Sequence, residues 1–368
     1  MTTTTARRKP VRQPAKSDRA PAVQSDLEAA VAAEDPQTLR DLFRDMLFIR
    51  RFEERTAQSY QQAKVGGYCH LNLGEEATVV GIGAAMRPTD YLFTNYREHG
   101  YALAKGIEPG RVMAELYGRS TGTSKGWGGS MHMYDTAARM LGGYAIVGGQ
   151  VPLAVGAALA IDYRDGDDVV VCQMGEGTTN IGAFHESLNI AALWGLPVVF
   201  LVINNQTGMG TTVEKSSAEP DLYKRAAAYR MRGERVDGTD VLAVRDLASE
   251  LIEDARRDGK PALLEAVSYR LKGHSVVDPA KYRSTDTVAV AREHDPIVLW
   301  QQRLLAAGVL TEQALADVEH AVAEGVAAAV EFADSSPHPE PSSLFDYTYA
   351  TPVPGDSRRL PADPLFTH

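Results

Sequence analysis

Cysteine is nearly absent from this 368-residue sequence, which contains only Cys69 and Cys172. Two cysteines form neither a disulfide framework nor a four-cysteine zinc site, and so few are typical of a reducing compartment. The sequence also lacks an uninterrupted apolar run of about eighteen residues, and it lacks the charged, apolar and small-residue series of a signal peptide. These absences argue against a membrane-spanning helix and against secretion, so we expect a cytoplasmic protein.

An excess of positive charge is lacking as well. The 38 Lys and Arg residues are outnumbered by 48 Asp and Glu residues, and the net charge is −10. Because binding to phosphate backbones needs a basic surface, nucleic acid is not an expected partner. The basic residues of the first 25 positions stand in a proline-rich run with almost no large apolar residue, which predicts a disordered tail over 1–25. A transit peptide is the alternative, but Pro10, Pro14 and Pro21 would break its amphipathic helix.

Apolar residues are plentiful, at 44%, and their pattern after residue 150 is regular. Short β-branched runs predict buried strands at 167–174, 197–204 and 262–269. Helical periodicity predicts helices at 151–163, 180–195 and 241–257. Alternating strands and helices indicate an α/β fold, a doubly wound parallel sheet flanked by helices, and we assign this domain to 26–335. Seven of the 19 prolines follow Ser335, which predicts an extended arm over 336–368 that lies on a partner subunit.

Two polar motifs stand where neighbouring strands are expected to end. GEG at 175–177 follows one predicted strand, and Asn204-Asn205 ends the next, with 26 residues between the motifs. Glycines at a strand end let backbone amides point at an anion such as a phosphate. Glu176 and Asn205 would add oxygen ligands of the kind that Mg²⁺ prefers. A tight acidic turn and an amide-rich turn, neither with a function, are the alternative for each motif alone.

This spacing resembles the thiamine-diphosphate signature, usually written GDG…NN. Around it, the chain resembles the alpha subunit of the decarboxylating first component of 2-oxo acid dehydrogenase complexes, from about Leu39 to Tyr349. The resemblance is carried by the segments TNYREHGYALAKG, KGWGGSMHMY, IVGGQVPLAVGAALA, HESLNIAALWGLPVVFLVINN and YRLKGHSVVDP. GGSMHM is similar to the pyruvate or acetoin type rather than the branched-chain type.

The resemblance implies a thiamine-diphosphate-binding fold and a set of site residues. The metal ligands for Mg²⁺ would be the side chains of Glu176 and Asn205 and the backbone carbonyl of Thr207. The implied cofactor-binding residues are His70, Tyr96, Arg97, Ala145, Val147, Gly177, Thr178, Met209 and His274. Of these, His274 would lie on a mobile loop over the active site, and it is the implied catalytic residue, holding phosphate or moving protons. Ser275 matches a position that is phosphorylated in animal relatives.

Several of these positions have a plain structural alternative. Arg97 could form a surface ion pair with Glu98, His70 could be a structural histidine, and Met209 could fill the core. The sequence also departs from the family pattern at three places. Glu176 stands where the family usually has aspartate, Thr207 where it often has an aromatic residue, and Lys272 where pyruvate-type relatives often have histidine. The longer Glu176 side chain could weaken the metal site, because Mg²⁺ tolerates poor geometry badly.

The activity implied by the resemblance is the thiamine-diphosphate-dependent oxidative decarboxylation of pyruvate, with transfer of the acetyl group to a lipoyl arm. The glutamate that activates the cofactor ring has no match here, so the resemblance implies a beta subunit, an α2β2 heterotetramer and a dihydrolipoyl acyltransferase. Acetoin or a branched-chain 2-oxo acid is an alternative substrate, and a non-catalytic scaffold is a distant alternative. A nicotinamide dehydrogenase is disfavoured, since the glycine-rich segments at 81–86, 175–180 and 208–213 each lack the third glycine of GxGxxG.

Overall fold

The computed structural model describes residues 24–347, which belong to two units, Met1–Glu34 and Asp35–His368. The described part of the first unit consists mainly of helix α1, Gln24–Ala33. Almost all of the predicted tail at 1–25, and residues 348–368 of the predicted arm, lie outside the described residues. The division at 25 and 335 therefore stays a prediction.

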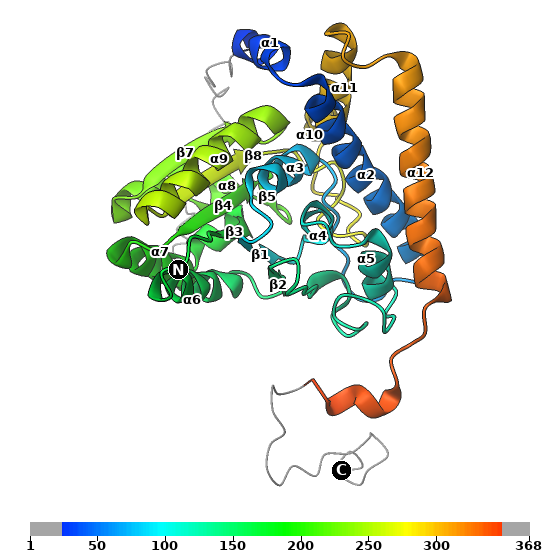
Figure 1. Cartoon of the computed structure of the whole chain (residues 1–368), viewed down its shortest axis with the longest axis horizontal. Helices are drawn as coiled ribbons and strands as arrows, with labels where there is room; N and C mark the ends of the chain where they lie inside the picture. Colours follow the sequence, from blue (N-terminus) through cyan, green and yellow to red (C-terminus); the bar gives the residue numbers. More distant parts are fainter. Residues whose placement is uncertain (1–23, 348–368) are drawn as a thin grey trace, which may run out of the picture. The chain divides into compact units, whose positions relative to one another are not determined.

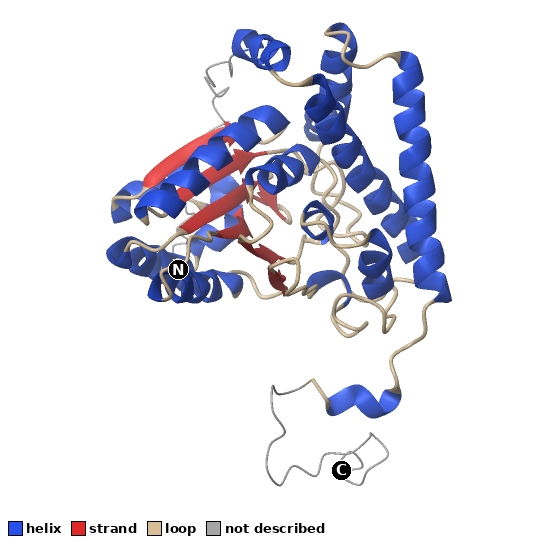
Figure 2. Cartoon of the chain, in the orientation of Figure 1, coloured by secondary structure: helices blue, strands red, loops and turns tan. Residues whose placement is uncertain are grey.

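The second unit is built on a sheet of six parallel strands in the order β2-β1-β3-β4-β8-β7 (Figures 1 and 2). Their bounds are β1 Tyr91–Asn95, β2 Met140–Tyr144, β3 Val170–Gly175, β4 Val198–Asn204, β7 Arg232–Asp237 and β8 Ala262–Val267. The chain adds β2 on one side of β1 and then β3 on the other side. In open α/β sheets, ligands bind at the carboxyl ends of the strands where the strand order reverses in this way.

Helices cover both faces of the sheet, as the alternating pattern predicted. Helices α6 (Gln150–Tyr163) and α7 (Gly182–Trp194) pack on one face, and α3 (Glu76–Ala85) and α9 (Val241–Asp258) pack on the other (Figure 1). Strand β4 is buried along its whole length, which explains its uninterrupted apolar run. The prediction of a doubly wound parallel sheet is confirmed.

A further group of helices packs beside the sheet, and several of them form a hydrophobic cluster separate from that of the sheet. It contains α2 (Pro36–Gln61), α4 (His99–Ala104), α5 (Pro109–Leu116), α10 (Thr285–Glu293), α11 (Pro296–Ala306) and α12 (Glu312–Ser335). Helix α2 begins after Asp35, whose side chain accepts a hydrogen bond from the Thr38 amide at 2.9 Å. Its buried face packs with α5 and α12 through Phe52, Met113 and Val326. No helix within residues 24–347 combines the length and the apolarity needed to cross a membrane.

Short elements connect the longer helices and strands, and two loops lie near the carboxyl edge of the sheet. The short elements are η1 (Gly129–Met131), η2 (Glu176–Asn180), β5 (Thr207–Gly208), β6 (Thr211–Thr212), α8 (Val213–Ser216), η3 (Leu222–Tyr229) and η4 (Pro341–Phe345). The loops at 62–75 and 268–284 run together, since Leu271 donates to the Leu73 carbonyl at 3.1 Å. Gly74 is required there: its φ is +98°, and a Cβ would lie 2.1 Å from the Tyr269 carbonyl oxygen. These loops bring together residues that are far apart in the sequence.

Candidate functional site

The predicted metal ligands leave the ends of two adjacent strands. β3 and β4 pair in register with Gly175 opposite Ile203, so Glu176 and Asn205 both follow the same edge of the sheet. Both side chains are buried, at 6% and 9% exposure. Burial raises the pKa of the Glu176 carboxyl, and the charge of Arg270 opposes that rise. A nearby cation stabilises the ionised form of a carboxyl group that is buried in this way.

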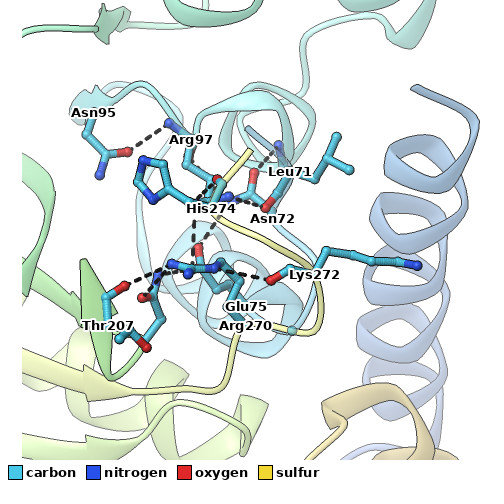
Figure 3. Close-up of polar contacts among 12 residues, drawn as sticks. Leu71, Asn72, Glu75, Asn95, Arg97, Thr207, Arg270, Lys272 and His274 are labelled. Atoms are coloured by element: carbon cyan, nitrogen blue, oxygen red, sulfur yellow. Dashed lines mark hydrogen bonds and ion pairs between the residues drawn. The ribbon is translucent and has the colours of Figure 1, made fainter. Parts of the chain in front are cut away.

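Arg270 contacts two of the three predicted ligand oxygens. Its Nη1 donates to Asn205 Oδ1 at 3.3 Å and to the Thr207 carbonyl oxygen at 2.9 Å. Figure 3 shows the Arg270 guanidinium between the carbonyl oxygens of Thr207 and Lys272. Two of the three oxygens predicted to bind Mg²⁺ thus already face a single cationic group. The residues present fit a divalent cation that displaces Arg270.

The predicted metal ligands include only one charged side chain, Glu176. Within the described residues, no group of three or more His, Cys, Asp or Glu side chains is arranged to hold a metal ion. A site with one carboxylate, one amide oxygen and one backbone carbonyl suits a cation that takes its remaining ligands from a diphosphate and from water.

Arg97 is placed by the carboxyl end of β1 and is buried. Its Nη1 donates to the Leu71 carbonyl at 2.5 Å and its Nη2 to the His274 carbonyl at 3.1 Å. Its Nε lies 3.6 Å from Glu75 Oε1. The alternative of a surface ion pair with Glu98 is wrong.

Glu98 lies in a different environment from Arg97. Its carboxyl accepts from the Met133 amide at 2.9 Å, and burial raises its pKa well above the usual value. The side chains of Arg97 and Glu98 therefore point to opposite sides of the chain after β1, and Arg97 faces the site.

The rings of His70, Tyr96 and His274 form one cluster beside Arg97. Ring centroids lie 4.3 Å apart for His70 and Tyr96, and 5.1 Å apart for His70 and His274. Burial and the charge of Arg97 lower the pKa of His274 to about 4, and the same causes lower the pKa of His70 well below its usual value. Within residues 24–347, the Nδ1 atoms of both histidines have no hydrogen-bond partner. Two buried ring nitrogens without partners fit a polar ligand.

Other predicted cofactor residues lie on the turn after β3 and on the loop after β2. Gly177 is exposed, and a Cβ there would meet no atom within 4 Å, so a ligand can approach its backbone. Thr178 lies against the loop after β2, because a Cβ at Gly148 would be 3.3 Å from Thr178 Cγ2. That loop carries Ala145 and Val147, and Val147 is 45% exposed.

Met209 projects from the loop after β5 and does not fill the core. It is 62% exposed, and its φ of +51° is unusual for a residue with a side chain. The alternative of a core methionine is therefore wrong, while its contact with a cofactor stays a prediction.

The loop that carries His274 is ordered by its own hydrogen bonds. Asp278 accepts from the His274 amide at 2.7 Å and from the Tyr282 hydroxyl at 2.6 Å, and Tyr282 in turn accepts from Arg270 at 3.2 Å. Ser275 is buried, at 7% exposure. The Lys272 side chain points away from Arg270 (Figure 3).

Sequence reasoning missed two residues of the site, Arg270 and Glu75. Glu75 accepts a hydrogen bond from Asn205 Nδ2 at 2.8 Å, and its side chain is buried. Arg270 belongs to the YRLKGHS segment that carried the resemblance, so a buried-charge argument on that segment could have found it. Glu75 stands beside a second glutamate in LGEEAT, and nothing local in the sequence distinguishes their roles.

Comparison with known proteins agrees with this geometry. The model of the family described as "Dehydrogenase E1 component" matches residues 44–342. The chain is 46% identical to a pyruvate dehydrogenase E1 component subunit alpha of Rhizobium meliloti, covering 82% of this chain and 87% of the relative. It is 41% identical to the corresponding subunit of Rickettsia conorii, covering 83% and 94% of the two chains. A chloroplastic subunit alpha-3 of Oryza sativa subsp. japonica is 40% identical, covering 92% and 83%.

The family match covers most of the described residues, and it includes both strand ends, the Arg97 segment and the His274 loop. The family depends on thiamine diphosphate, and it comprises 2-oxo acid dehydrogenases. The chain therefore belongs to the dehydrogenase E1 component family.

Proposed function

We propose that this chain is the alpha subunit of a pyruvate dehydrogenase of the acetyl-transferring type. The observation that supports the proposal is that Asn205 Oδ1 and the Thr207 carbonyl face one cationic group, Arg270, while Glu176 follows the end of the adjacent strand. The names of the relatives support pyruvate as the substrate. Acetoin and branched-chain 2-oxo acids remain the alternatives among substrates.

In this proposal, Mg²⁺ is held by Glu176 Oε, Asn205 Oδ1 and the Thr207 carbonyl, and Arg97 binds the diphosphate. Arg97 is suited to this role because a planar guanidinium offers several donors to phosphate oxygens. The exposed backbone of Gly177 and the nearby Thr178 would contact the same diphosphate. When bound, thiamine diphosphate supplies the carbon centre at which a 2-oxo acid loses carbon dioxide.

The two histidines act next to the diphosphate in this proposal. The lowered pKa of His274 leaves its ring neutral at pH 7, so that Nδ1 is able to accept or donate one proton. His70 packs against it and against Tyr96. In this proposal the rings keep water from one side of the site, and His274 holds or moves a proton near the substrate.

A beta subunit would cover the open side of the site. Ile146, Val147 and Met209, on loops that carry predicted cofactor residues, are 77%, 45% and 62% exposed. On helices α6 and α7, Tyr163 and Leu193 are 87% and 73% exposed. Large exposed apolar side chains of this kind are suited to contact with a protein partner. We infer an α2β2 assembly that passes the acetyl group to the lipoyl domains of a dihydrolipoyl acyltransferase.

The test is to reconstitute this chain with the beta subunit whose gene lies nearest to its own. The assembled pair should reduce an artificial electron acceptor with pyruvate, and the rate should require both thiamine diphosphate and Mg²⁺. A parallel panel with acetoin and branched-chain 2-oxo acids ranks the substrates by kcat/KM. The alpha chain alone should show no turnover. Full activity without a beta subunit, or a preference for another substrate, would contradict the proposal.

A further inference from the structure

Glu75 is a buried acidic residue that touches the metal site without being one of its predicted ligands. It precedes helix α3 and is 1% exposed, and its carboxyl does not cap the helix. Instead the side chain reaches the end of β4, which lies 130 positions later in the sequence. A carboxyl group buried to this degree is costly unless its oxygens have partners. Its contacts therefore indicate its role.

Both oxygens of Glu75 have partners. Oε1 accepts from Asn205 Nδ2 at 2.8 Å and lies 3.6 Å from Arg97 Nε. Oε2 accepts from Asn72 Nδ2 at 3.3 Å. One carboxyl group thus joins the amide of a predicted metal ligand to the arginine predicted to bind diphosphate.

The contact with Glu75 determines which way the Asn205 amide faces. With Nδ2 turned to Glu75, Oδ1 points to the opposite side, where it accepts from Arg270 Nη1 at 3.3 Å. The flipped amide would place Oδ1 against the Glu75 carboxyl and Nδ2 against the Arg270 guanidinium. Both of those contacts are repulsive, so only one orientation is stable, and it presents an oxygen to the cation site.

We propose that Glu75 is a positioning residue that holds the amide of Asn205 with its oxygen directed at the metal. This inference rests on the proposed function, since it assigns Asn205 to a divalent cation. Glu75 acts through a hydrogen bond to a ligand and does not itself bind the metal. Residues with such a role often change metal affinity about 10–100-fold when they are replaced.

The test uses the assembled α/β enzyme with thiamine diphosphate, titrated with Mn²⁺ and followed by electron paramagnetic resonance. Glu75→Met fills the same space but cannot accept a hydrogen bond, and it should weaken Mn²⁺ binding at least about tenfold. Glu75→Gln keeps an acceptor oxygen for Asn205 Nδ2, and it should bind Mn²⁺ nearly as well as the unsubstituted enzyme. Because glutamine carries no charge, retained Mn²⁺ binding in Glu75→Gln means that the hydrogen bond to Asn205, and not the charge of Glu75, supports the metal site.

Glu265 offers a matched control. It is also fully buried, and it accepts from the amide of the neighbouring asparagine, Asn204 Nδ2, at 2.6 Å. Glu265→Met removes the same kind of bond and should lower the thermal midpoint of the enzyme much as Glu75→Met does. It should leave the Mn²⁺ affinity unchanged, because Asn204 is not a predicted ligand.

A double-mutant cycle keeps the test decisive if Glu75→Met does not assemble. Asn205→Asp places two carboxyl groups against each other, and Glu75→Gln would then give the new carboxyl a donor. Glu75→Gln should therefore raise the Mn²⁺ affinity of Asn205→Asp while leaving that of the unsubstituted enzyme nearly the same. Such a difference shows that the two side chains are energetically coupled, as their hydrogen bond predicts.

The outcomes separate this inference from the proposed function. Failure of the unsubstituted α/β enzyme to bind Mn²⁺ with thiamine diphosphate would overturn both. Normal binding that Glu75→Met does not weaken would overturn only the role of Glu75. A loss with Glu75→Gln as large as with Glu75→Met would make Glu75 a direct ligand or a charge contributor, and would also overturn the positioning role.

Discussion

Replacing Arg270 with methionine should strengthen metal binding in the absence of thiamine diphosphate. Its guanidinium donates to Asn205 Oδ1 and to the Thr207 carbonyl, so a divalent cation has to displace it. Methionine fills a similar volume but carries no charge and donates no hydrogen bond. The substitution therefore removes the group that competes with the metal.

The expected size follows from the two hydrogen bonds. A net contribution of about 1.5 kcal/mol for each bond from a charged donor gives about 3 kcal/mol for displacement. Since about 1.4 kcal/mol corresponds to a tenfold change in an equilibrium constant, Arg270→Met should raise the affinity for Mn²⁺ about tenfold to hundredfold. The measurement is a Mn²⁺ titration of the cofactor-free α/β enzyme, followed by electron paramagnetic resonance. Thiamine diphosphate is omitted because its phosphates would supply additional contacts.

Arg283 provides the control for charge. It lies on the same loop and donates to the Lys272 carbonyl at 3.0 Å, but it makes no contact with the predicted ligands. Arg283→Met makes the same change in net charge and should leave the Mn²⁺ affinity close to that of the unsubstituted enzyme. An unchanged or weaker affinity in Arg270→Met would refute the competition, and so would an equal gain in Arg283→Met.

Three further outcomes are expected. The pKa values of His70 and His274 are lowered in the folded chain, so below about pH 6.5 the unfolded chain takes up protons that the folded chain does not. The thermal midpoint of the cofactor-free enzyme should fall between pH 6.5 and pH 4, and His274→Asn should make this fall shallower; an unchanged slope would contradict the shift. Asp90→Ala removes a buried carboxylate that accepts from Arg256 Nη2 at 2.9 Å and from the amides of Arg87 and Val169, and urea denaturation should show a loss of about 3–5 kcal/mol. If the free energy of unfolding fell by less than about 1 kcal/mol, the Asp90–Arg256 pair would not be a major contribution to stability. Asn205→Leu should abolish Mg²⁺-dependent binding of thiamine diphosphate in calorimetry while the enzyme remains assembled, and retained binding would remove Asn205 from the ligands.

The fold was predictable because its strands are buried on both faces. The continuous apolar runs that became β3 and β4 have no amphipathic alternative, and the helix between them fixed their parallel pairing. The same reasoning placed Glu176 and Asn205 at one edge of the sheet. Spacing alone therefore predicted the two residues that anchor the candidate site.

The rest of the site depends on long-range packing that local patterns do not encode. Glu75 and Arg270 are 130 and 65 positions away from Asn205, and they reach it only because the loops at 62–75 and 268–284 pack together. The alternative that Arg97 pairs with Glu98 is wrong for a related reason. Adjacent residues at a strand end point to opposite sides, so proximity in sequence was a poor guide to contact.

Anomalous diffraction from crystals of the assembled α/β enzyme, grown with thiamine diphosphate and Mn²⁺, tests the central claim most directly. We predict an anomalous peak bound by the Glu176 carboxylate, Asn205 Oδ1 and the Thr207 carbonyl, with the Arg270 guanidinium moved off the last two oxygens. Thiamine diphosphate bound with no metal peak there, and with Arg270 still donating to both oxygens, would contradict it.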